Sequence, residues 1–124
     1  MAWVHGPVYK DGYVVVCNFK YNPIEDNRFS LLQNRFRELS QEEKIVIELV
    51  VDSFGMYSGK ALEKITHTEI PWQEARAHCL PQGRSNVVIS KESICKYFSE
   101  VAEQFQINSV AGLRDYIDSR LGDV

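Results

Sequence analysis

One segment near the middle of the chain constrains the fold more than any other. Ser40-Gln-Glu-Glu43 has the spacing of a capping box, in which each of the two end residues accepts a hydrogen bond from the other's backbone amide. Apolar residues follow over more than half of the helix circumference: Ile45, Val46, Ile47, Leu49, Val50, Val51 and Phe54. Because a surface helix usually shows only an apolar stripe, this pattern predicts a helix at the centre of the core. Gly55 is predicted to end it as a left-handed cap.

Other segments carry helix signals of the same kind. Ser58, Ser90 and Ser109 each precede a segment with apolar residues at helical spacing, although Gly112 should weaken the last helix by about 1 kcal/mol relative to Ala. Residues 29–39 have the spacing of a short amphipathic helix. Residues 14–17 and 87–89 are rich in Val and Ile and locally favour extended structure. The sequence therefore predicts a mostly α fold, a small single-domain helical bundle with at most short β segments.

Charge and cysteine content restrict the classes of function. The 124 residues include 14 Lys and Arg against 17 Asp and Glu, so the net charge is −3. This balance argues against an overall basic nucleic-acid binder or a polybasic membrane binder. The apolar runs are too short to cross a bilayer, and three widely spaced cysteines do not form a disulfide framework. The first residues lack the pattern of a signal peptide. We expect a cytoplasmic protein without a membrane partner.

The chain shows no pattern of enzyme chemistry. It contains no phosphate-binding loop, dinucleotide fingerprint, nucleophile elbow or zinc-protease helix. His5, His67 and His78 do not have metal-ligand spacing from a pair of cysteines. We therefore expect neither catalysis nor a metal or other cofactor. A hydrolase or metalloenzyme would require folding to bring His67, Cys79 and a carboxylate together.

Two polar and aromatic motifs are the candidate site. Each places a Trp and a His close to a Gly or Pro that fixes the backbone, and the candidate residues are Trp3, His5, Gly6, Pro7 and Tyr9 in the first and Thr66, His67, Glu69, Pro71 and Trp72 in the second. One interpretation is structural, with His and Thr bonding backbone groups at a corner while the Trp rings close over the core. The other is a recognition surface, because such side chains on rigid turns suit a binding hot spot. The residues alone favour the structural interpretation.

Residues 41–66 also have the spacing of a helix–turn–helix, with residues 55–57 as the turn. A DNA-reading second helix should be rich in basic or amide side chains. This one offers Lys60 and Lys64 but also Glu63, with Glu69 just beyond it. Tight packing of two helices accounts for the pattern better. A DNA-binding regulator of a phage or mobile element stays as the alternative function.

Several blocks of sequence resemble the Panacea domain, the SocA-like antitoxin domain of bacteria and phages. The blocks occur in the family's order over residues 2–98: Ala2-Trp3-Val-His5-Gly6-Pro7-Val8-Tyr9, Ser40-Gln-Glu-Glu-Lys44, Phe54-Gly55-Met-Tyr57-Ser58-Gly59-Lys-Ala-Leu62, Ile65-Thr66-His67-Thr-Glu69-Ile-Pro71-Trp72-Gln-Glu-Ala75-Arg76, Ile89-Ser90-Lys-Glu-Ser-Ile94 and Tyr97-Phe98. We therefore expect residues 1–124 to be a single domain of this kind, with terminal helices over residues 99–124 beyond the main motifs.

The resemblance implies an antitoxin that binds and neutralises a cognate toxin of a bacterial or phage toxin–antitoxin system. It also implies a protease or its adaptor as a second partner, because some members are implicated in delivering the toxin for degradation. Whether the motif residues contact the toxin or only hold the fold does not follow from it.

The chain differs from the family pattern at its start. Family members usually have a helical part before the first motif, so we expect a truncated, split or internally started copy. Apolar surface uncovered in this way would need a partner or a second copy, as in a homodimer. The segment after Tyr9 is usually helical in the family, and we expect a helix there against the local preference of residues 14–17.

Overall fold

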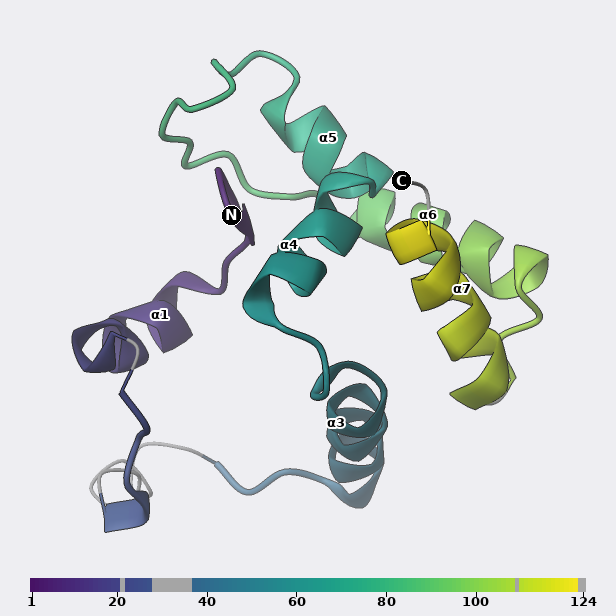
Figure 1. Ribbon diagram of the computed structural model, residues 1–124, viewed down its shortest axis with the longest axis horizontal. Coiled ribbons are helices and arrows are strands. Elements are labelled where there is room, and N and C mark those ends of the chain that lie inside the picture. Colours follow the sequence, from purple (N-terminus) through teal and green to yellow (C-terminus); the bar gives the residue numbers. More distant parts are fainter. Residues whose placement is uncertain (21, 28–36, 109, 123–124) are drawn as a thin grey trace.

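The computed structural model describes residues 1–20, 22–27, 37–108 and 110–122, and it is mostly helical (Figure 1). The helices are α1 (Lys10–Val16), α3 (Gln41–Phe54), α4 (Gly59–His67), α5 (Ile70–Arg76), α6 (Lys91–Gln104) and α7 (Val110–Gly122), with a short 3-10 turn η1 (Cys17–Phe19) after α1. Strands β1 (Ala2–Trp3) and β2 (Gly6–Pro7) pair antiparallel, with Ala2 opposite Pro7. The predicted fold class, mostly α with short β segments, is confirmed.

The predicted serine caps are present wherever they fall within the described residues. The amide of Glu43 donates to Ser40 Oγ at 3.2 Å, and the amide of Ser40 donates to Glu43 Oε2 at 2.8 Å, which completes the capping box of α3. Ser58 and Ser90 accept from Ala61 and Ser93 in the same manner. The predicted cap Ser109 and most of the amphipathic segment 29–39 lie outside the described residues.

The core lies between α4, α6 and α7. Its buried apolar residues are Ile65, Tyr97, Val101, Tyr116 and Ile117, surrounded by partly buried side chains such as Phe54, Leu62 and Leu113. Rings of Phe98 and Phe105 meet the Tyr116 ring edge to face. Because α4 and α7 are each other's main neighbours, the core joins parts of the chain about fifty residues apart.

Helix α3 is not the centre of the core, so that prediction is wrong. Its apolar side chains are between 43 % and 59 % exposed from Ile45 to Val51, and its one buried residue is Ser53. The helix meets α7 near its C-terminal end and lies at the edge of the cluster of helices in Figure 1. Gly55 caps it in a right-handed conformation, with φ −64°, instead of the predicted left-handed one.

The two segments that locally favour extended structure do not form strands. Residues 14–16 belong to α1, as the family resemblance implied, and the Tyr13 ring of this helix packs edge to face on Trp3 at 4.9 Å. Residues 87–89 form no strand, but the carbonyl of Val87 accepts a hydrogen bond from the amide of Ala2 at 2.9 Å. Helix α1 and residue 87 therefore both contact the N-terminal hairpin.

Candidate functional site

The two sequence motifs meet in space, where the β1–β2 hairpin packs against α4 and α5. Gly6 makes this approach possible. It has φ +116°, and a Cβ atom there would lie 3.0 Å from Thr66 Oγ1 on α4. A side chain at position 6 would thus be strained by its backbone and crowded by its neighbour. We call the region formed by His5, Glu63, His67, Trp72 and Gln73 the corner site.

Trp72 and Arg76 on α5 attach the hairpin to the helices. Trp72 Nε1 donates to the carbonyl of Trp3 at 3.0 Å, and Arg76 Nη1 donates to the carbonyl of Ala2 at 3.1 Å. Pro71 occupies the first turn of α5, as predicted, where its missing amide costs no hydrogen bond. These contacts give α5 and its tryptophan a structural function.

Glu63 lies between two histidines. His5 Nδ1 donates to Glu63 Oε1 at 3.0 Å, while His67 Nε2 lies 4.0 Å from the same oxygen, too far for a hydrogen bond. The hydrogen bond from His5 lowers the pKa of the Glu63 carboxyl, and nearby positive charge, including Lys60, lowers it further. Glu63 is therefore an anion that orients His5 at the rim of the site.

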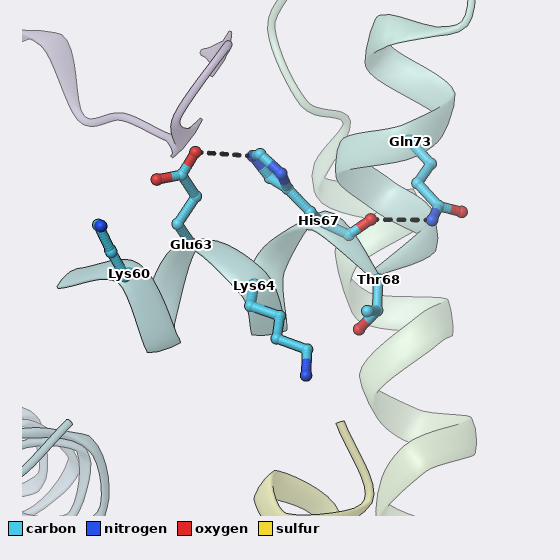
Figure 2. Close-up of a pocket in the computed structure, with 6 residues that line it drawn as sticks. All are labelled: Lys60, Glu63, Lys64, His67, Thr68 and Gln73. Carbon is cyan, nitrogen blue, oxygen red and sulfur yellow. Dashed lines mark hydrogen bonds and ion pairs between the residues drawn. The ribbon is translucent and has the colours of Figure 1, made fainter. Parts of the chain in front are cut away.

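His67 is held by its ring and by its backbone. The imidazole stacks on the Trp72 indole with ring centroids 4.0 Å apart and planes 18° apart. Its carbonyl accepts from Gln73 Nε2 at 2.9 Å, as Figure 2 shows. His67 Nε2 is buried without a hydrogen-bond partner. The imidazole is therefore held in place by stacking on Trp72.

Two surface cavities flank the corner. One, of about 570 Å³, is lined by the six residues of Figure 2: Lys60, Glu63, Lys64, His67, Thr68 and Gln73. A second of similar volume shares Glu63, His67 and Gln73 and extends to His5 and Cys79. Cys79 and His67 thus line one cavity with Glu63, which lies 4.0 Å from His67 Nε2, but no hydrogen bond from Cys79 to either residue is present in the described part of the chain. Within that part, no group of three or more His, Cys, Asp or Glu side chains could hold a metal ion.

Lys60 and Lys64, the candidate DNA contacts, are not presented as a basic surface. Lys64 Nζ donates to the carbonyl of Leu121 on α7 at 2.8 Å and is partly buried. Lys60 lies close enough to Glu63 to lower its pKa. One lysine therefore ties α4 to α7 and the other is offset by a carboxylate, which favours the packing interpretation of residues 41–66.

Glu69 has a structural position that its motif did not reveal. It is buried, and its Oε1 accepts from the Tyr116 hydroxyl at 2.8 Å, which in turn lies 3.3 Å from the Tyr97 hydroxyl. Burial raises the pKa of the Glu69 carboxyl, and the hydrogen bond from Tyr116 only partly offsets this. The three side chains form a polar network inside the apolar core.

The candidate residues divide by exposure. Gly6, Glu69 and Pro71 are buried, and Trp3, Thr66, His67 and Trp72 are half-buried and bonded within the corner. His5, Pro7 and Tyr9 are exposed. Sequence reasoning did not single out Glu63, Arg76 or Tyr116. The placement of Glu63 four residues before His67, on one helix face, was the available signal.

This geometry defines a class of protein: a small helical domain whose N-terminal hairpin is fixed to two helices by a His, Trp and Pro motif. The family model described as "Antitoxin SocA-like, Panacea domain" matches residues 1–73, which contain the hairpin, α3, α4 and the start of α5. The chain belongs to this family. The resembling blocks at residues 89–98 lie outside the matched span.

No curated protein and no solved structure matches the chain. Among the helices that the structure describes, none is long and apolar enough to cross a membrane.

Proposed function

We propose that this protein is a cytoplasmic antitoxin that binds the protein product of a neighbouring gene and neutralises its toxicity. Membership of the SocA-like antitoxin family carries the proposal. The exposed apolar side chains of α3 support it, because monomeric proteins rarely leave a large contiguous apolar surface uncovered. A protein partner of an antitoxin would cover such a surface.

The corner site fits this function as a scaffold. Its side chains link the hairpin, α4 and α5 to one another, which suits a role in positioning the surrounding surface. His5 in the turn of the hairpin and Tyr9 at the start of α1 are exposed and available to a partner. We therefore propose that neutralisation is stoichiometric binding and not catalysis.

Expression of the neighbouring gene with and without this protein tests the proposal. We expect the neighbouring product to stop growth alone, growth to be restored by co-expression, and the two proteins to co-purify. With purified proteins, inhibition of the toxin should reach completion at an equimolar ratio. Neutralisation at a small fraction of that ratio would indicate an enzyme and contradict stoichiometric binding.

A shorter half-life of the toxin in co-expressing cells would add delivery to a protease to this function. Growth arrest that persists despite expression of both proteins, with no co-purification, would contradict the antitoxin function. The Trp72→Ala variant is a control for loss of the scaffold. It should lose the Trp72 hydrogen bond to Trp3 and reduce folding and neutralisation together.

A further inference from the structure

One face of α3 combines exposed aliphatic side chains with carboxylates. Ile45 and Leu49 are one helical turn apart and are 55 % and 43 % exposed, and Val46 beside them is 58 % exposed. Successive residues advance by about 100° around a helix, which places Glu48 and Asp52 along the border of this aliphatic group. We call these five residues the acidic face of α3.

The acidic face has an excess of negative charge. Glu48 and Asp52 are exposed, and Glu42, also exposed, lies about 60° from Ile45 on the Leu49 side. Lys44, the one lysine of the helix, lies one turn before Glu48 and about 40° from it, at the outer edge of this face. Glu43, on the other side, already pairs with Arg37. A partner that covers the aliphatic group therefore meets three carboxylates, those of Glu42, Glu48 and Asp52, against one lysine.

This arrangement disfavours a second copy of the chain as the partner. A two-fold pair through this face would place the carboxylates of one copy beside those of the other, and each copy carries a net charge of −3. Like charges opposed at an interface destabilise it. A partner with basic residues beside its apolar ones complements the same face.

We propose that the acidic face of α3 binds an amphipathic α-helix of a partner protein, apolar on one side and bordered by Lys or Arg. The aliphatic residues, at i and i+4, form a ridge of the kind that packs into the groove of another helix. Glu48 and Asp52 pair with the basic border and set the orientation of the bound helix. The inference rests on the proposed function, for which it names the chemistry of the bound segment.

A pair of synthetic peptides tests the charge requirement. Each is a fluorescein-labelled helix of about 18 residues, long enough to span α3, with Leu along one side and either Lys or Glu along both borders. Fluorescence anisotropy with the whole chain should show the Lys peptide binding at least about tenfold more tightly than the Glu peptide at low salt. The difference should shrink at about 0.5 M salt because the charges are exposed.

Matched variants assign the binding to α3. The double variant Glu48→Lys/Asp52→Lys should reverse the preference between the two peptides. Glu100→Lys/Glu103→Lys makes the same change in net charge on exposed residues of α6 and should leave the preference intact. Leu49→Ser should weaken both peptides, whereas Ile94→Ser, at 39 % exposure on a helix of equal length, should weaken neither. Equal effects of the α3 and α6 variants would overturn the proposal, as would concentration-dependent dimerisation that Leu49→Ser abolishes.

The toxin assay separates failure of this inference from failure of the proposed function. If the wild-type chain neutralises the toxin and Glu48→Lys/Asp52→Lys does not, while circular dichroism shows that the variant is folded, the acidic face is supported. If the folded variant neutralises the toxin as well as the wild type does, the antitoxin function stands and the acidic face is overturned.

Discussion

At the scale of single residues, Gly112 on α7 lies where backbone carbonyls of the preceding loop leave no room for a side chain. A Cβ atom there would lie 2.8 Å from the carbonyl oxygen of Phe105 and 3.0 Å from that of Gln106. We expect Gly112→Ala to lower the free energy of unfolding by about 1–3 kcal/mol through this overpacking, measured by urea denaturation. Gly59→Ala is the control, since nothing lies within 4 Å of its Cβ position, and it should be neutral or slightly stabilising.

A pH-dependent prediction follows from burial of Glu69. Because its pKa is raised above the ordinary value of 4.5, the unfolded chain loses this proton at a lower pH than the folded protein does. The contribution of Glu69 to stability is thus fully present below about pH 4.5 and is lost as the pH rises through the raised pKa. Unfolding of wild type and Glu69→Gln should show the wild type losing stability relative to the variant over that range.

Glu92→Gln provides the control of opposite sign. The hydrogen bond from Ser90 lowers the pKa of Glu92, so its contribution is present above the ordinary value and is lost as the pH falls through the lowered one. A Glu69→Gln difference that is constant with pH, or that follows the trend of Glu92→Gln, would contradict a raised pKa at Glu69.

Sequence reasoning at this scale succeeded for local contacts and failed for distant ones. The hydrogen bonds of Ser40, Ser58 and Ser90 join residues three apart, and the spacing in the chain predicted them. Gly112 was expected only to weaken its helix, because the carbonyl of Phe105 that requires a glycine is brought there by tertiary packing. The contact of Glu69 with Tyr116, forty-seven residues away, has no local signal either.

At the scale of elements, Arg76 at the end of α5 connects three parts of the chain. Its guanidinium donates to the carbonyl of Ala2 in β1 and to the carbonyls of Leu80, Pro81 and Gly83 in the following loop. It is buried, at 7 % exposure. We expect Arg76→Met to cost about 2–4 kcal/mol, because one buried and three partly buried hydrogen bonds lose their donor while the side-chain volume is kept.

Thermal and urea unfolding followed by circular dichroism measure this cost. Arg84→Met removes the same charge from an exposed position in the next segment and should change stability by less than about 0.5 kcal/mol. Similar losses in the two variants would indicate that charge, and not the shared hydrogen bonds, determines the effect.

Helix α3 shows which properties of an element the sequence predicts and which it does not. Periodicity and the capping box predicted its existence and its start at Gln41. They did not reveal which of its sides would be covered, because that depends on where α7 lies. The same apolar pattern is compatible with a core helix and with a helix that a partner protein covers, and here most of its apolar side chains are exposed.

At the scale of the whole molecule, the family match and the core have different boundaries. The match ends at residue 73, but Ile65 and Glu69 within it are covered by side chains of α6 and α7. The resemblance of the sequence predicted the family and the positions of the motifs. It did not predict the exposed α3 or the ties of Lys64 and Glu69 to α7, since these depend on how the C-terminal helices pack.

The hydrogen bond between Glu69 and Tyr116 therefore has a consequence for synthesis of the protein. The chain is synthesised from its N-terminus, so the first seventy residues emerge from the ribosome with Ile65 and Glu69 still exposed to solvent. Tyr116 follows Glu69 by forty-seven residues, so its segment leaves the ribosome well after that of Glu69. The core of a nascent chain therefore stays incomplete until α7 has emerged, and stop codons introduced before α7 would release polypeptides that proteases and chaperones bind as unfolded chains.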